Sequence, residues 1–79
     1  KALAKELAPS GITVNCVAPG VIDTAMNGRL NAAERRALAE EIPLGRFGTP
    51  EEVAECVYYL ATAKYVTGQI VGADGGFSL

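Results

Sequence analysis

The stretch NCVAPGVIDTAM, residues 15–26, holds the residues whose types and spacing best suit chemistry. An apolar run that starts at Ile12 ends in Pro19-Gly20, and the hydroxyl of Thr24 follows four residues after the glycine. Proline fixes one backbone dihedral, glycine lets another backbone come close, and a threonine hydroxyl can bond an amide or phosphate oxygen. These residue types predict either a plain turn or a loop shaped around a ligand, and alone they favour neither.

Other reactive side chains are less well placed. The carboxylate pairs Glu40-Glu41 and Glu51-Glu52 fall at predicted helix ends, where carboxylates are normally solvated. No tyrosine is followed by a lysine four residues later. Cys16 and Cys56 are far apart, and the sequence has no histidine to complete a zinc site or activate a thiol. We therefore assign no catalytic residue and no metal ligand from these types.

The segment Gly68–Asp74 invites comparison with a glycine-rich phosphate loop. It carries aspartate where a third glycine would be needed, and no helix is expected after it to present an N-terminus to a phosphate. We expect close strand packing and a turn here instead.

The elements that must position the 15–26 stretch can be predicted from periodicity and capping signals. Asn31 with Glu34, and Thr49 with Glu52, have the spacing of capping boxes, and Pro50 suits a first helical position. Val53, Val57 and Leu60, joined by Ala54 and Ala61, predict the inner face of the helix after Thr49. In order, the predicted elements are a helix over Lys1–Ala8, a strand over Ile12–Ala18, a helix from Asn31 to about Glu41, a helix over Pro50–Ala63, and a strand over Gln69–Ala73.

This order predicts an α/β fold with a parallel sheet, because helical crossovers separate the strands. Ile12–Ala18 is apolar enough for a strand buried on both faces, and the amide of Asn15 within it should hydrogen-bond neighbouring backbone. In a parallel sheet, ligands bind at the carboxyl ends of strands, which is where Pro19–Thr24 falls.

Size and composition limit the classes of protein. A chain of 79 residues forms at most one small domain, and its hydrophobic content of 49% argues against disorder. The net charge of −2, without a basic cluster, gives no footprint for nucleic acid or an anionic membrane, and no apolar run is long enough to span a bilayer. Two unpaired small thiols suit a cytoplasmic protein. The start at Lys1, with the one methionine at Met26, and a sheet of two strands both predict a piece of a larger polypeptide.

Three segments, GITVNCVAPGVIDTAM, IPLGRFGTPEEVAECVYYLA and VTGQIVGADGG, resemble in this order the C-terminal third of the short-chain dehydrogenases/reductases. The bacterial 3-oxoacyl-(acyl-carrier-protein) reductase-like branch is the most similar. The resemblance implies that residues 1–79 are a C-terminal fragment of a single dinucleotide-binding domain. The two predicted strands would be the sixth and seventh of a Rossmann-type, doubly wound parallel sheet.

The resemblance also implies roles for the 15–26 stretch. Pro19-Gly20 would form the nicotinamide-side loop of an NADP or NAD site. The backbone of Ile22 would bind the nicotinamide carboxamide, and Thr24 would bond the carboxamide or the pyrophosphate. Residues from Thr24 to Phe47 would be a mobile lid over a small-molecule carbonyl or alcohol substrate, with Met26 and Leu30 facing the pocket.

The family's Tyr-x-x-x-Lys pair, its catalytic serine and asparagine, and its first glycine-rich loop match no position here. The resemblance places them upstream of Lys1, so we expect the 79 residues alone to be inactive. It further implies a homo-oligomer, a dimer or tetramer, with the Lys1–Ala8 helix lining one interface. The Pro50–Ala63 helix and last strand would line another, which suits an exposed Tyr58 or Tyr59 and the apolar Phe77 and Leu79.

Three hypotheses follow for the parent protein. It reduces a carbonyl, with a 3-oxoacyl thioester as the first candidate; it belongs to the same family but acts on a sugar, steroid or small alcohol; or the chain is a non-catalytic fragment that oligomerises. The lid decides the substrate, and NAD versus NADP is decided near a strand that the sequence does not include.

Overall fold

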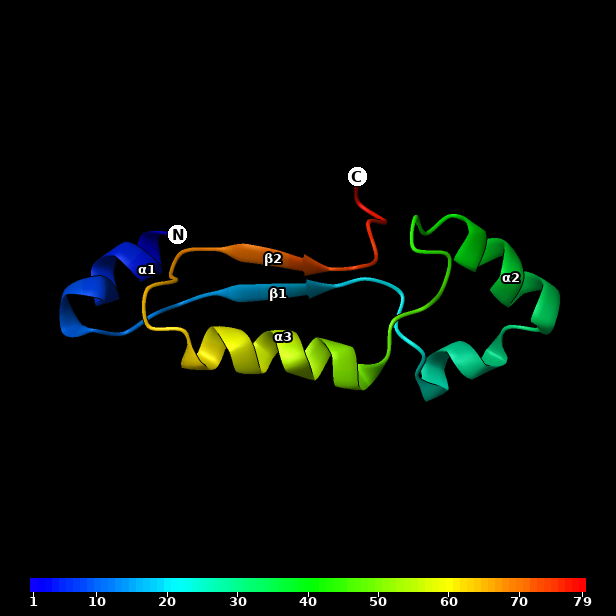
Figure 1. Cartoon of the computed structure of the whole chain (residues 1–79), viewed down its shortest axis with the longest axis horizontal. Coiled ribbons are helices and arrows are strands. Elements are labelled where there is room, and N and C mark those ends of the chain that lie inside the picture. Colours follow the sequence, from blue (N-terminus) through cyan, green and yellow to red (C-terminus); the bar gives the residue numbers. More distant parts are fainter.

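The computed structural model describes the backbone of residues 1–79 and the side chains of all of them except Met26 and Asn27. Two strands run side by side in the middle of the molecule, with helices around them (Figure 1). The elements in chain order are α1 (Ala2–Leu7), the 3₁₀ helix η1 (Ala8–Ser10), β1 (Cys16–Pro19), the 3₁₀ helix η2 (Ala25–Arg29), α2 (Ala32–Glu40), α3 (Pro50–Thr62) and β2 (Ile70–Ala73).

The two strands pair in parallel, as the element order predicts. The register runs from Cys16 opposite Ile70 to Pro19 opposite Ala73. The first strand is shorter than the predicted Ile12–Ala18. Over residues 12–15, hydrogen bonds to a side chain and to the turn before β2 take the place of strand pairing. The Val14 N–H donates to Thr67 Oγ1 at 3.0 Å, and the Val14 carbonyl accepts from the Gly68 N–H at 2.8 Å.

Asn15 performs the linking role that the sequence predicts. Its Nδ2 donates to the Val66 carbonyl at 3.0 Å, and its Oδ1 accepts from the Gln69 N–H at 3.1 Å. One amide therefore ties the residue before β1 to the turn before β2 and sets where strand pairing begins.

Both longer helices start at capping boxes. The Asn31 side chain accepts from the Glu34 N–H while the Glu34 carboxylate accepts from the Asn31 N–H, and Thr49 and Glu52 repeat the arrangement. These reciprocal bonds satisfy backbone donors that a helix start leaves unpaired. The predicted helix boundaries agree with the structure to within about one residue, which is the usual uncertainty of a helix end.

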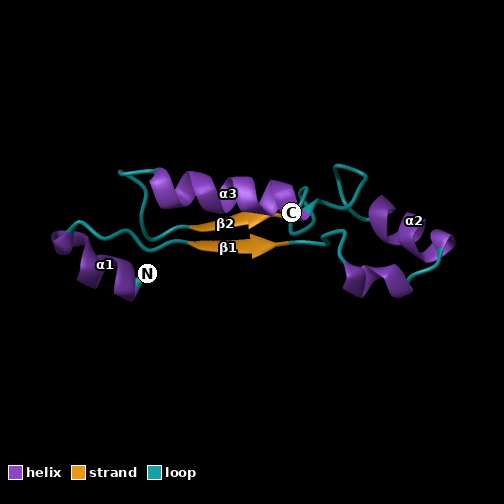
Figure 2. Cartoon of the chain, turned by 90° about the horizontal axis from the view of Figure 1, so that it is seen from below, coloured by secondary structure: helices purple, strands orange, loops and turns teal.

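Helix α3 packs on one face of the two strands, as the view from below shows (Figure 2). Its predicted inner face is partly wrong. Leu60 is buried and Val53 half-buried, but Val57 is 49% exposed and the half-buried Cys56 takes its place. Cys56 and Leu60, three and seven residues after Val53, lie on the same face of the helix as Val53, toward the sheet. Val57 therefore lies at the edge of the buried stripe. Ala54 and Ala61 are also exposed.

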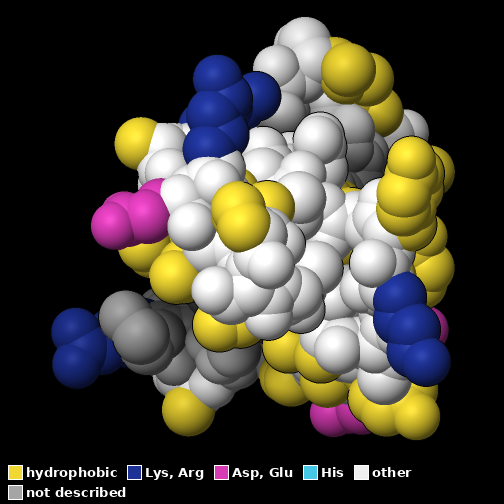
Figure 3. Space-filling model, turned by 90° about the vertical axis from the view of Figure 1, so that its left-hand side faces the viewer, with side chains coloured by type: hydrophobic (Ala, Val, Ile, Leu, Met, Phe, Trp, Pro, Cys, Tyr) yellow, Lys and Arg dark blue, Asp and Glu magenta, His cyan; other side chains and the backbone are white. Residues whose placement is uncertain are grey.

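The expectation of a strand buried on both faces is wrong for this chain. Cys16, Ala18 and Pro19 are exposed, because α3 covers one face and α1 lies beyond the amino ends of the strands (Figures 1 and 2). Seen from the α1 end, hydrophobic side chains reach the surface at many places (Figure 3). The sheet buries apolar surface on one side and presents it on the other.

The described side chains form no single hydrophobic core. The buried residues Ala4, Ile42 and Leu60 lie near Gly68, near Gly75 and within α3 respectively. The radius of gyration is 15.5 Å, against about 12 Å for a compact domain of this length. The chain is an elongated body of 50 × 23 × 17 Å with three separate points of burial.

Helices η2 and α2 form a lobe beyond the carboxyl ends of both strands (Figure 1). The chain enters this lobe after Asp23 and returns at Phe47, so the lobe spans the segment that the resemblance assigns to a lid.

Candidate functional site

Gly20 lies at the carboxyl end of β1, packed directly against the backbone of Asp74. Its N–H donates to the Ala73 carbonyl at 3.1 Å. A Cβ on residue 20 would lie 2.6 Å from Asp74 Cβ and 2.8 Å from Asp74 Cα. The sequence indicated a close backbone approach at this glycine, and the structure identifies the approaching backbone as the end of β2.

The loop after Gly20 is held by a second backbone contact. The Gly48 N–H donates to the Val21 carbonyl at 3.0 Å, and the Asp23 N–H donates to the Gly48 carbonyl at 2.8 Å, so Ile22 forms an isolated parallel bridge with Gly48. Successive peptide groups of an extended chain point to opposite sides, so the N–H and carbonyl of Ile22 point away from Gly48. The two backbone hydrogen bonds to Gly48 therefore hold the loop in one conformation.

The remaining predicted site residues differ in their surroundings. Pro19 ends β1 and is exposed, Thr24 is exposed where the loop enters the lobe, and Leu30 is half-buried just before α2. The side chain of Met26 lies outside the described residues. The structure therefore places Pro19 at the end of β1 and Gly20, Ile22 and Thr24 in the loop that follows it, at the predicted edge of the sheet.

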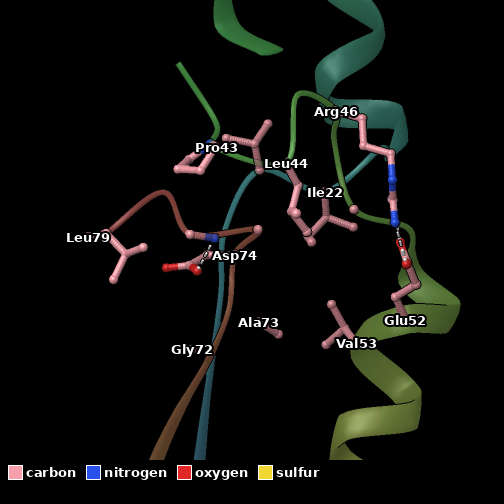
Figure 4. Close-up of a pocket in the computed structure, with 14 residues that line it drawn as sticks. Ile22, Pro43, Leu44, Arg46, Glu52, Val53, Gly72, Ala73, Asp74 and Leu79 are labelled. Atoms are coloured by element: carbon pink, nitrogen blue, oxygen red, sulfur yellow. Dashed lines mark hydrogen bonds and ion pairs between the residues drawn. The ribbon is translucent and has the colours of Figure 1, made fainter. Parts of the chain in front are cut away.

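A pocket of about 470 Å³ opens beside this loop, beyond the carboxyl end of β2 (Figure 4). Ile22 from the loop and Val53 from α3 form one side of it. Pro43, Leu44 and Leu79 form the other. The wall is mostly aliphatic with a few polar groups at its margin, which is the usual make-up of a small-molecule site.

An ion pair closes one margin of the pocket. Arg46 Nη1 donates to Glu52 Oε1 and Arg46 Nη2 to Glu52 Oε2, both at 2.8 Å. The guanidinium, helped by the Thr49 N–H, lowers the pKa of the Glu52 carboxyl from its usual 4.5 to about 2. Glu52 thus serves both the capping box and a bidentate pair with the segment that leads out of the lobe.

Sequence reasoning missed the Arg46–Glu52 pair and the contact of Asp74 with Gly20. The first had a detectable signal, because Glu52 is the third residue of the helix capped by Thr49 and an arginine stands three residues before that cap. Asp74 had none, because its partner Gly20 is distant in the sequence.

Two classes of feature are not found among the described residues. No group of three or more His, Cys, Asp or Glu side chains in that part of the chain could hold a metal ion. None of the helices described has both the length and the apolar character needed to cross a bilayer.

A family model described as Enoyl-(Acyl carrier protein) reductase matches residues 1–78. The chain is 53% identical over 78 residues to the 3-oxoacyl-[acyl-carrier-protein] reductase FabG of Thermotoga maritima. That alignment covers 96% of this chain and 32% of the relative. The chain thus spans about a third of the length of the curated relatives it matches.

Solved structures share the fold described above. A 3-oxoacyl-[acyl-carrier protein] reductase from Brucella melitensis superposes with a TM-score of 0.91 at 36% identity, over 99% of this chain and 30% of its own. A protein from Agrobacterium tumefaciens, given the provisional name 2-deoxy-d-gluconate 3-dehydrogenase, was solved with bound NADP. It superposes with a TM-score of 0.87 at 44% identity, over 99% of this chain and 33% of its own.

Proposed function

Because this chain belongs to the short-chain dehydrogenase/reductase family, and has the α/β fold of that family's Rossmann-type sheet, we propose that it is the C-terminal segment of one dinucleotide-binding domain. The parent protein would be an NAD(P)-dependent carbonyl reductase or alcohol dehydrogenase. The observation that carries the proposal is the braced loop Gly20–Thr24 beside an aliphatic pocket at the carboxyl ends of parallel strands.

The construction of the loop supports a nicotinamide site. Gly20 is fixed against Asp74, and the flanking peptides of Val21 and Asp23 are fixed against Gly48, so the peptide groups of Ile22 are held in one orientation. Ile22 would bind the carboxamide through its backbone, and the exposed hydroxyl of Thr24 would bond the carboxamide or the pyrophosphate. When bound there, NADP or NAD would supply or accept the hydride. The NADP in the Agrobacterium structure supports NADP as the first cofactor to test.

A 3-oxoacyl thioester is the proposed substrate. The names of the Thermotoga and Brucella proteins support this choice, and so does the aliphatic wall of Ile22, Leu44 and Val53 next to the loop. Met26 and Leu30 of the lobe would face the substrate. The name given to the Agrobacterium protein supports a sugar acid as the second candidate.

Catalysis would depend on residues outside this chain. The family's proton donor is a tyrosine with a lysine four residues later, and no position among residues 1–79 has that spacing. We therefore propose that this segment contributes cofactor and substrate contacts and that the 79 residues alone have no activity.

We also propose that the parent protein is a cytoplasmic homo-oligomer, a dimer or tetramer. Tyr58 and Tyr59 on α3 are 70% and 61% exposed, and Phe77 and Leu79 follow β2 with large exposed fractions. Exposed aromatic and aliphatic side chains of this kind suit a subunit interface. Both cysteines are free thiols, as expected in a reducing compartment.

Thr24→Ala in the full-length protein tests the function directly. The assay follows oxidation of NADPH, and of NADH in parallel, with a short 3-oxoacyl thioester and with a sugar acid as substrates. We expect wild type to prefer the thioester. We expect Thr24→Ala to lower kcat/KM. The fall should correspond to a loss of about 1–3 kcal/mol of transition-state stabilisation, the scale of one buried hydrogen bond.

Thr24→Ser is the matched control, because it keeps the hydroxyl and should retain most of the activity. Unchanged kinetics in Thr24→Ala would contradict the cofactor role of this residue. An intact mass of 8.2 kDa for the natural polypeptide would contradict the parent enzyme altogether.

A further inference from the structure

Asp74, the residue after β2, organises the turn of residues 74–78, hereafter the Asp74 turn. Its Oδ1 accepts from the Gly76 N–H at 3.0 Å. Its Oδ2 accepts from the Ser78 hydroxyl at 2.7 Å and from the Ser78 N–H at 3.3 Å. Gly75 and Gly76 have φ of 62° and 89°, a backbone region that costs other residues strain. The carboxylate bonds thus add to the backbone bonds of the turn, in which the Phe77 N–H donates to the Asp74 carbonyl at 3.1 Å and the Leu79 N–H to the Gly76 carbonyl at 3.0 Å.

The Asp74 turn braces two segments of the proposed site. On one side, the Asp74 backbone packs against Gly20 so closely that a Cβ there would overlap it. On the other side, the Gly75 carbonyl accepts from the Leu44 N–H at 3.0 Å, and a Cβ on Gly75 would lie 2.8 Å from Ile42 Cγ2. The turn thus contacts both the start of the loop and the segment that leaves the lobe. Figure 4 shows Asp74 below Pro43 and Leu44 of that segment.

We propose that Asp74 is a positioning residue for the nicotinamide cofactor. Its carboxylate holds the Asp74 turn, and the turn fixes Gly20 and therefore the orientation of the peptides that follow it. Asp74 lies at the edge of the pocket and would act on the loop through its contact with Gly20. This inference rests on the proposed function, because it assigns the role to the same Gly20–Thr24 loop.

The charge state of the carboxylate agrees with this role. Hydrogen bonds from the Ser78 hydroxyl and the Gly76 N–H lower the pKa of Asp74 below its usual 3.8. Asp74 is therefore ionised at neutral pH and accepts all three bonds without competing as a donor.

The test is the dissociation constant of NADPH for the full-length protein, measured by the fluorescence of the bound nucleotide without substrate. We expect Asp74→Ala to raise this Kd about five- to tenfold, because the loop must then be ordered by the ligand. kcat at saturating NADPH should change by less than about twofold, because the bound geometry is the same once formed. Asp74→Asn keeps an acceptor for Gly76 and should restore the Kd to within about twofold of wild type.

Thr67→Val is the matched control for a merely structural role. It removes the acceptor for the Val14 N–H at the opposite end of the strands, so it lowers stability without touching the loop. We expect it to lower the unfolding temperature to a similar extent as Asp74→Ala while leaving the NADPH Kd unchanged.

A double-mutant cycle with Gly20→Ala identifies the route of the effect. Gly20→Ala forces the loop away from Asp74, so it should raise the Kd itself. If Asp74 acts through Gly20, the increase in Kd of the double variant should be smaller than the product of the fold-increases of the two single variants. Independent, multiplying effects would overturn the proposed route.

Two further outcomes are decisive and can be told apart. If wild type binds NADPH but Asp74→Ala binds it equally well, Asp74 has no positioning role and the proposed function stands. If wild type binds neither NADPH nor NADH, the proposed function fails and the inference about Asp74 fails with it.

Discussion

Arg35 and Asp23 form an ion pair across the base of the lobe, with Arg35 Nη2 3.1 Å from Asp23 Oδ1. The guanidinium carbon of the same arginine lies 4.7 Å from the centroid of the Phe47 ring. Asp23 is the residue before the chain enters the lobe, and Phe47 is where it returns. One side chain of α2 therefore contacts both ends of the segment that the site would use as a lid.

We predict that Arg35→Ala loosens the lobe of the full-length protein. The ion pair is partly exposed and the cation–π contact adds to it, so their loss should favour opening of α2 by about 0.5–1 kcal/mol. Hydrogen exchange of the α2 amides should accelerate by about two- to fivefold. Arg36→Ala, the neighbouring arginine on the same helix, is the control. Equal acceleration of exchange in both variants would show that the contacts of Arg35 do not specifically hold α2 in place.

The Arg46–Glu52 pair predicts a specific pH dependence of stability. Since the pKa of Glu52 is lowered from 4.5 to about 2 in the folded chain, its contribution is fully present above about pH 4.5. That contribution is lost as the pH falls toward 2, because the unfolded state then binds the proton more readily. Glu52→Gln keeps the capping-box acceptor but removes the charge.

The measurement is the free energy of unfolding of the full-length protein by denaturant at several pH values between 2 and 5, for wild type and Glu52→Gln. We expect the difference between them to shrink as the pH falls. Glu51→Gln, one residue earlier in α3, controls for the loss of a carboxylate at the helix start. A difference that stays constant over the whole range would show that the pair does not perturb Glu52.

We also predict that residues 1–79 do not fold alone into a stable monomer. The buried side chains are separated, and Leu3, Ile12, Leu44 and Ile70 are among the large hydrophobic residues left exposed. The apolar area buried is too small to offset the conformational entropy of so extended a chain. Far-ultraviolet circular dichroism during heating should show no cooperative transition, and light scattering should detect association. A monomer that melts in one sharp transition would refute this prediction.

The secondary structure could largely be read from local signals. Asn31 and Thr49 cap helices because their side chains bond the N–H groups three residues later, an interaction contained within four residues. Gly11, with φ of 75°, ends the first helical segment for the same local reason. The inner face of α3 was harder to predict. Cys56 is half-buried and Val57 exposed, and this difference depends on where the strands, which are distant in the sequence, lie against the helix.

The candidate site, too, was only partly predictable from the sequence. The loop from Pro19 to Thr24 is visible in the sequence, because proline and glycine after an apolar strand mark the end of that strand. Its bracing is not visible there, because Gly20 meets Asp74 and Ile22 meets Gly48 across the end of the sheet.

The sequence by itself determined the helices, the two parallel strands, the loop at their carboxyl ends and the family to which the chain belongs. These follow from residue patterns that act over a few positions or that are shared, in order, with relatives. Only the tertiary structure decided that Asp74 packs against Gly20 and that Arg35 links the two ends of the lobe. Such contacts depend on how β1, β2 and α3 pack, and packing brings together residues whose separation in the sequence carries no signal of the contact.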